Sequence, residues 1–173
     1  MAAIFAFKCD RCGKTHEGAP SFAYMAPDEY ASLSDEQKSE IASLADDSCT
    51  IAYPGETHYF VRSILEIPIH GTEEPFSLGL WVSVSEKSFV RYTTEPHATI
   101  EGEGFFGWVC NEISIYPYKQ PRPTDVVLQP KGYRPKLVLH RGSPEDDPLV
   151  IDQASGISVD RAQELAELAL HGG

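Results

Sequence analysis

The sequence lacks any long apolar run and is short of positive charge. No tract has the length and apolarity of a membrane-spanning helix, so we expect no membrane insertion. Lysine and arginine together number 14 against 26 acidic residues, which gives a formal net charge of −12. A surface of that sign repels phosphate backbones, and nucleic acid is therefore not expected as a partner. The remaining composition, 42% apolar and 23% charged, is typical of a globular protein.

The short motifs of several enzyme classes are absent as well. There is no G-x-S-x-G elbow, no Walker loop for phosphate and no H-E-x-x-H pair. A secretory signal is not expected either, because residues 1–7 are too short for its apolar core and carry no positive flank. We therefore predict a cytoplasmic protein, whose four cysteines serve metal binding, packing or redox chemistry rather than disulfides.

Turn and capping signals predict short strands with a few helices between them. Alternating or β-rich runs indicate strands over 4–7, 49–53, 57–69, 78–84, 126–129 and 136–140. Serine caps indicate helices that begin after Ser34, Ser85 and Ser158, the first of which should end near 46–47, while 18–27 reads as an irregular connection. The predicted fold is α+β, with a mostly antiparallel sheet covered by helices on one side. We expect one domain over 1–173, with a knuckle segment over 1–20 and a C-terminal helix over 158–171.

The sequence Cys9-Asp10-Arg11-Cys12-Gly13 favours a metal knuckle. Two cysteines three positions apart can bind one ion, and the glycine after them suits a turn whose backbone conformation disfavours a Cβ. A thioredoxin-type redox pair would begin a helix inside a βαβ unit, and that context is missing. Plain packing thiols and redox chemistry remain the alternatives.

A structural zinc ion needs four protein ligands, and a second Cys-x-x-Cys is absent. Single residues must therefore complete the set. His16 can return from the same loop, and Cys49 lies at the start of a predicted strand that can meet the knuckle in space. We predict zinc ligation by Cys9, Cys12, His16 and Cys49, with His58 and Cys110 in reserve. Cys110 follows an apolar run and is more typical of a small core residue.

One predicted strand carries a candidate acid–base group. His58, Arg62 and Glu66 share a face of the run 57–69. The simpler interpretation is a solvated strand face with cross-strand ion pairs. We therefore assign no catalytic residue and no organic cofactor.

Several blocks of the sequence together carry a family resemblance. They are Cys9-x-x-Cys12-Gly13-x-x-His16-x-Gly18-x-Pro20, Asp46-Asp47-Ser48-Cys49, His58-Tyr59-Phe60-Val61-Arg62, Leu80-Trp81-Val82-Ser83-Val84-Ser85, Phe106-Gly107-Trp108 and Tyr133-Arg134-Pro135. In this order they resemble the bacterial family catalogued as domain of unknown function 2199. The resemblance implies a single-domain bacterial protein of uncharacterised activity, and it adds weight to Cys9, Cys12, His16 and Cys49 as a set. The chain departs from the family at Asp147, where members tend to have histidine, and at Cys110, where serine is expected.

The leading functional prediction is a non-enzymatic acidic protein that binds a basic protein partner. Inhibitors and immunity proteins work in this way, since they cover the cationic substrate site of a toxin and charge complementarity speeds the association. The charge is uneven, because 119–141 holds six basic residues and one acid, Asp125. The alternative is a metal-dependent or acid–base enzyme, which needs an open metal position or a cleft with perturbed titrating groups. A module that senses zinc or thiol oxidation is a third hypothesis and requires accessible cysteines.

Overall fold

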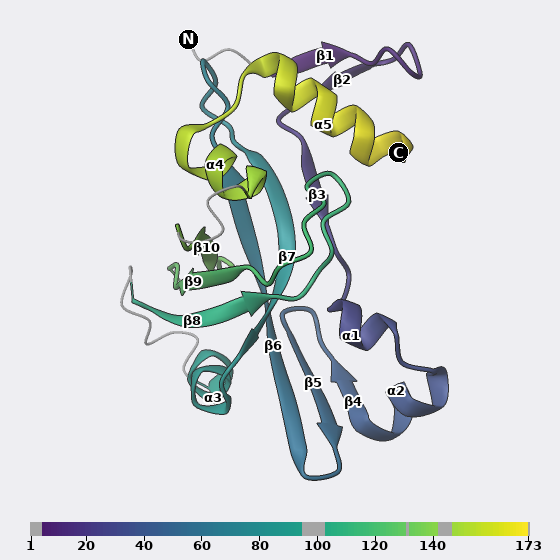
Figure 1. Ribbon diagram of the computed structural model, residues 1–173, viewed down its shortest axis with the longest axis vertical. Coiled ribbons are helices and arrows are strands. Elements are labelled where there is room, and N and C mark those ends of the chain that lie inside the picture. The colour runs from purple at the N-terminus through teal and green to yellow at the C-terminus, as the bar shows by residue number, and fades with distance from the viewer. Residues whose placement is uncertain (1–4, 95–102, 131, 142–146, 173) are drawn as a thin grey trace.

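Two β-sheets and five helices make up the part of the chain that the computed structural model describes, residues 5–94, 103–130, 132–141 and 147–172 (Figure 1). The strands are β1 (Ala6–Lys8), β2 (Thr15–Glu17), β3 (Ser21–Ala23), β4 (Ala42–Leu44), β5 (Ser48–Tyr53), β6 (Glu56–Ile67), β7 (Phe76–Val84), β8 (Gly104–Val109), β9 (Pro123–Val127) and β10 (Lys136–Leu139). The helices are α1 (Asp28–Ala31), α2 (Asp35–Ile41), α3 (Glu86–Thr94), α4 (Pro148–Ser155) and α5 (Val159–His171). The mixed α+β class is confirmed.

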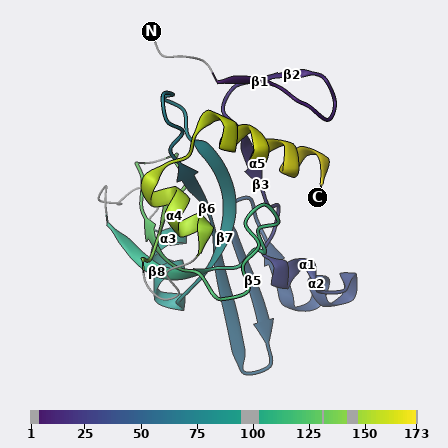
Figure 2. The ribbon, with the colours of Figure 1, turned by 45° about the horizontal axis from the view of Figure 1, so that its top comes forward.

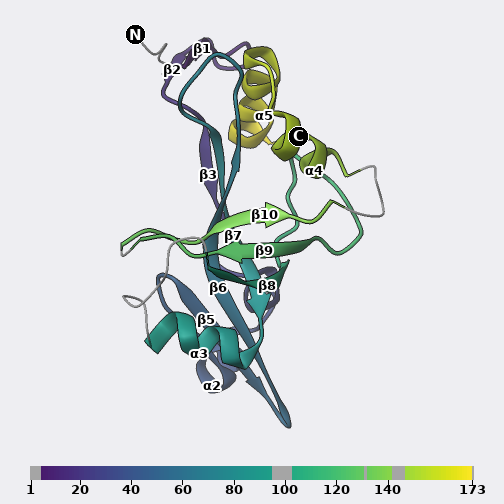
Figure 3. The same cartoon turned by 90° about the vertical axis from the view of Figure 1, so that its left-hand side faces the viewer.

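The larger sheet closes on itself as a small barrel. β6 and β7 form a long antiparallel pair, and β8, β9 and β10 continue from β7 in antiparallel order. β10 then returns to β6 through a parallel contact of Lys136 with Ile64. Figure 3 shows β8, β9 and β10 lying across the long β6–β7 pair. Closure pairs backbone groups that an open edge would leave unsatisfied.

The arrangement of strands corrects the predicted single sheet with helices on one side. β1 and β2 form a separate two-stranded sheet, and β3 pairs with β7 in parallel. The strand β3 lies within 18–27, where an irregular connection was expected, and α2 ends at Ile41 so that β4 follows directly. A strand of three residues is too short to show a periodic pattern, so its formation depends on pairing with another strand.

Two apolar clusters lie on opposite faces of β6 and β7. Val61, Leu65 and Ile67 point into the barrel and are fully buried, as the alternation in this run predicts. Helix α5 covers the same cluster with Ala162, Leu165 and Ala166. The second cluster, on the other face, contains Leu33, Cys49, Ile51, Phe60 and Trp81.

The predicted helix starts are present and are hydrogen-bonded as caps. The Gln37 N–H donates to Ser34 Oγ, and the Gln37 side chain accepts from the Ser34 N–H, so the capping box at α2 is confirmed. Ser158 Oγ accepts from the Arg161 N–H at the start of α5. The antiparallel pairing of β5 with β6 forms a hairpin that turns at Pro54 and Gly55. Among the described residues, no helix combines the length and the apolarity needed to cross a membrane.

Asp147, one of the two departures from the family pattern, has a structural role. Its carboxylate accepts hydrogen bonds from Arg122 Nε at 2.7 Å and Nη2 at 3.0 Å, and both side chains are buried. It also accepts from the Leu149 N–H as the N-cap of α4. A buried ion pair of this kind joins α4 to the segment that enters β9.

Candidate metal centre

The turn between β1 and β2 brings the two cysteines of the knuckle together. The strands pair with Phe7 opposite His16. Inside the turn, the Gly13 N–H donates to the Cys9 carbonyl and the Cys9 N–H donates to the Lys14 carbonyl, both at 2.9 Å. Gly13 has φ +71°, a conformation that residues with a Cβ rarely adopt. The glycine after the second cysteine therefore allows the tight turn that the sequence predicts.

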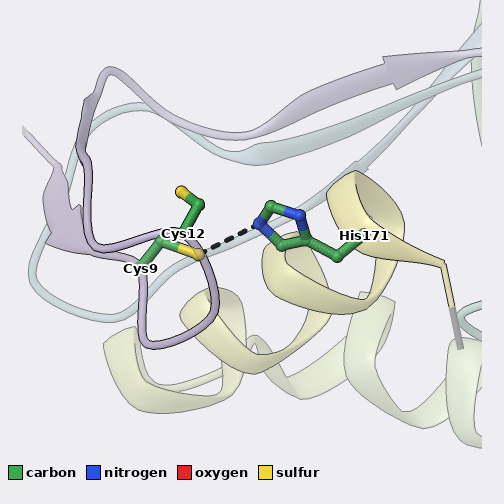
Figure 4. Close-up of side chains that lie close together, drawn as sticks. All are labelled: Cys9, Cys12 and His171. Carbon is green, nitrogen blue, oxygen red and sulfur yellow. Dashed lines mark hydrogen bonds between the residues drawn. The ribbon is translucent and has the colours of Figure 1, made fainter.

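The last turn of α5 adds a histidine to this site. Helix α5 lies beside the β1–β2 hairpin (Figure 2). His171 points at the turn, with Nε2 3.1 Å from Cys9 Sγ (Figure 4). One ligand atom from each of Cys9, Cys12 and His171 lies within 4.8 Å of the others. Within the described ranges, no other group of three or more histidine, cysteine or acidic side chains is so close.

Hydrogen bonds hold the hairpin against α5. They run from the Asp10 N–H to Glu167 Oε1 (2.8 Å), from Arg11 Nη1 to the Gly172 carbonyl (3.0 Å) and from Gln163 Nε2 to the Lys8 carbonyl (3.2 Å). Apolar packing supports them, since Phe5, Phe7 and Cys9 are buried in the same cluster as the inner face of α5. The two segments that supply the ligands are thus packed together by the protein itself.

The environment favours the thiolate form of Cys12. A hydrogen bond from the backbone of Lys14 and one from His16 lower the pKa of the exposed Cys12 thiol from 9.0 to about 6. Cys9 and His171 contribute in the same direction. At neutral pH Cys12 is therefore mostly a thiolate, the form that binds metals.

The structure separates the four predicted ligands into two places. Cys9, Cys12 and His16 are at the hairpin, where His16 Nε2 lies 3.5 Å from Cys12 Sγ. Cys49 lies in β5 within the second apolar cluster and is 1% exposed. Burial and the charge of Glu29 raise the pKa of its thiol to about 12. Cys49 is therefore not beside the other three.

His171 is the residue of the candidate metal site that sequence reasoning missed. Its only signal is its place at the end of an amphipathic helix, where a histidine also suits the negative end of the helix dipole. It lies 162 positions from Cys9, and no local spacing rule relates residues so far apart. Only the packing of α5 on the hairpin reveals the contact.

Comparison with known protein families gives one match. The family described as uncharacterised proteins conserved in bacteria, DUF2199, matches residues 8–157. The chain belongs to this family. The matched part contains Cys9, Cys12 and His16, and His171 lies beyond it. No curated protein and no solved structure matches the chain.

This DUF2199 protein has a second polar site around His58, with a cavity of about 480 Å³ between β6, the end of β7 and α1. His58 Nδ1 lies 2.6 Å from Glu29 and Nε2 lies 3.4 Å from Glu56. Burial alone would lower the pKa of His58, but the two carboxylates raise it above its ordinary value. Because both ring nitrogens face carboxylates, the imidazole is held as a partner in ion pairs rather than presented to a substrate.

The three residues of the acid–base hypothesis do not converge in this protein. Arg62 stacks over Trp81, with 5.8 Å from guanidinium carbon to ring centre. Glu66 pairs with Lys136 of the neighbouring strand at 2.8 Å. His58 and Glu66 are eight residues apart on one strand, a separation of roughly 26 Å at the usual rise. The Glu66 contact is the cross-strand ion pair of the simpler interpretation.

Proposed function

We propose that this DUF2199 protein is a zinc-stabilised, non-enzymatic interaction protein of the cytoplasm that binds a basic protein partner. The observation that carries the metal part is the convergence of Cys9, Cys12 and His171 within 4.8 Å. Two thiol groups and an imidazole suit zinc, whereas magnesium and calcium prefer oxygen ligands.

The metal would clamp two segments from opposite ends of the sequence. Cys9 and Cys12 belong to the hairpin, and His171 belongs to α5. The β1–β2 sheet has three residue pairs, too few to be stable by itself in water. A bound ion would therefore stabilise the hairpin and α5 together, which is the role of a structural zinc site.

The acidic end of the molecule supports the choice of a basic partner. Residues 28–62 carry a net charge of −6, half of the whole, and their elements α1, α2, β4, β5 and the β5–β6 turn lie at the end opposite to the hairpin (Figure 1). All but one of their acidic side chains are exposed: Asp28, Asp35, Glu36, Glu40, Asp46, Asp47 and Glu56. A concentrated negative field attracts a positive surface and speeds association.

Three of the six basic residues in 119–141 are held in ion pairs, and one of these pairs, Arg134 with Asp47, offsets part of the acidic field; Lys119 and Arg141 are exposed without an ion pair among the described residues. Arg122 is paired with Asp147, Arg134 with Asp47 and Lys136 with Glu66. Lys131 lies outside the described residues. The pairing leaves the acidic end as the better-supported binding face.

Metal content tests the zinc proposal. We expect about one zinc per chain in the untagged protein by mass spectrometry, the stoichiometry of a single closed site. Cys9→Ser and His171→Ala should lose the metal, while the matched controls Cys110→Ala and His140→Ala should keep it. A wild-type protein that takes up no zinc after incubation with the ion, or equal zinc in all five proteins, contradicts the proposal.

Charge reversal tests the partner proposal. The double variant Glu36→Lys with Glu40→Lys changes the acidic end, and Glu17→Lys with Glu73→Lys makes the same change of net charge at the other end. We expect the proteins captured by the wild type to be basic and their retention to fall as the salt concentration rises. Of the two double variants, only the one at the acidic end should reduce this retention. Capture of acidic proteins only, or an equal effect of both double variants, contradicts a binding face at the acidic end.

A further inference from the structure

A second imidazole lies at the cysteine turn. His16 is on β2, directly opposite Phe7 of β1, and the two rings stack with 5.1 Å between centroids and 24° between planes. Because Phe7 is buried and fixed, it holds the His16 ring against the turn. In this position His16 Nε2 lies 3.5 Å from Cys12 Sγ.

Two separations match the spacing of ligands around one zinc ion, although His16 is not among the three residues whose ligand atoms all lie within 4.8 Å of one another and would have to move closer to Cys9 and His171. With zinc–sulfur bonds of about 2.3 Å and zinc–nitrogen bonds of about 2.0–2.1 Å, tetrahedral geometry places sulfur and nitrogen about 3.6 Å apart. The Cys12–His16 separation of 3.5 Å agrees, and the Cys9–His171 separation of 3.1 Å agrees to within about half an ångström. Each cysteine thus has one histidine at ligand spacing.

We propose that His16 is the fourth ligand, so that Cys9, Cys12, His16 and His171 form a closed tetrahedral site with two sulfur and two nitrogen donors. The proposal rests on the proposed zinc binding and goes further, because it assigns the complete ligand set and excludes Cys49. Two thiolates and two neutral imidazoles around Zn²⁺ give no net charge, which suits a site whose Cys9 is buried.

A closed site decides whether the metal has a structural or a catalytic role. Catalytic zinc keeps one position open for water or substrate, whereas four protein ligands leave none. The described cavities agree, since those around Tyr92 and Arg134, around His58 and around Trp108 are lined by none of the four ligands. The metal therefore has a structural role, and the metal-dependent enzyme loses its site.

The ligand set also predicts that loss of His16 and loss of His171 affect the link between the hairpin and α5 differently. Three of the four ligands lie within the segment 9–16, and His171 comes from another part of the chain. Loss of His16 leaves one ligand from the helix in place, so the metal still joins the hairpin to α5, but with an open position. Loss of His171 removes the ligand from α5, so the metal can no longer join the hairpin to the helix and should be lost.

X-ray absorption at the zinc edge of the wild-type protein is the first test, because it needs no variant. We expect two sulfur and two nitrogen neighbours at the usual bond lengths. Three sulfur neighbours would mean that another cysteine binds the zinc in place of His16, and this would overturn the proposal. Two sulfur neighbours with a single imidazole and a water oxygen would overturn it as well. A wild type without bound zinc would instead overturn the proposed function together with this inference.

Cobalt substitution tests His16 directly. We expect the wild type and the control His140→Ala to show the intense visible bands of tetrahedral Co²⁺. His16→Ala should weaken these bands and lower zinc affinity at least tenfold, and His16→Cys should restore them with an added thiolate charge-transfer band. If His16→Ala keeps the wild-type spectrum and affinity, His16 is not a ligand, although zinc binding by the other three residues still stands.

Discussion

Cys12 and Cys49 carry the same thiol in opposite environments. Cys12 lies in an exposed turn, where the Lys14 backbone and His16 lower the pKa of its thiol to about 6. Cys49 lies in β5, where burial and Glu29 raise the pKa to about 12. The comparison teaches that the groups around its sulfur decide whether a cysteine favours the thiolate form, and the position of the residue along a strand does not reveal those groups.

The same contrast separates the two ends of the molecule. The hairpin end depends on a three-pair sheet, a few hydrogen bonds to α5, the packing of Phe5 and Phe7 in the first apolar cluster, and the cysteine site. The acidic end is supported by the second apolar cluster, with Ile51, Phe60 and Trp81 fully or almost fully buried. Changes to the cysteines should therefore act on metal binding at one end and on packing at the other.

The largest expected difference is in alkylation of the metal-free protein. At pH 7 we expect Cys12 to react with iodoacetamide at least about a hundredfold faster than Cys49, since only Cys12 is mostly thiolate and exposed. The Cys12 rate should fall as the pH drops through about 6. Mass spectrometry of the labelled peptides measures both rates. Equal rates in the native protein, matching those in urea, would show that the two environments are alike.

Substitution by serine should separate stability from metal binding. Cys49→Ser places a hydroxyl in a side-chain site that is 1% exposed, and we expect a loss of about 2 kcal/mol of unfolding free energy. Its zinc content should stay at the wild-type level. Cys12→Ser, at an exposed site, should cost less than about 0.5 kcal/mol in chelator yet abolish metal binding. Urea unfolding with and without zinc measures the unfolding free energy of each variant. If the Cys49→Ser protein binds no zinc, the two cysteines do not differ in their role in metal binding.

Removal of the metal should loosen one end only. After chelation we expect amide hydrogen exchange to become about tenfold faster or more in β1, β2 and the last turn of α5. Exchange in β5 and its partner β6 should not change, because those strands depend on apolar packing. Exchange measured by mass spectrometry on peptides reports each segment. Uniform acceleration over the whole chain would mean that the metal stabilises the fold globally.

The smallest effect concerns the pH dependence of the acidic end. The raised pKa of His58 means that its ion pair with Glu29 adds stability below the ordinary histidine pKa and loses it as the pH rises through the folded value. Glu29→Gln should lower the pKa of His58, whereas Glu40→Gln should not. An NMR titration of the His58 ring distinguishes the two. If His58 has the wild-type pKa in both variants, Glu29 does not control the pKa of His58.

Much of the local structure was predictable because its signals lie within a few residues. Ser34 with Gln37 and Ser158 with Arg161 are contacts between neighbours in sequence, and both form. The alternation that buries Val61, Leu65 and Ile67 also follows from strand geometry alone. The strand β3 and the helix α4 were not predicted. β3 is defined by pairing with β7, and α4 by the Asp147 cap with its buried Arg122 partner.

By itself, the sequence determined the cysteine turn, with Gly13 behind it and His16 within reach, because these residues act through contacts inside one short segment. It also determined the acidic character and the α+β class, since both follow from composition and periodicity. Only the tertiary structure decided that the larger sheet closes, that Cys49 is a core residue and that His171 meets Cys9 across 162 positions. Such contacts depend on how whole elements pack, and no spacing rule along the chain encodes a distance between elements.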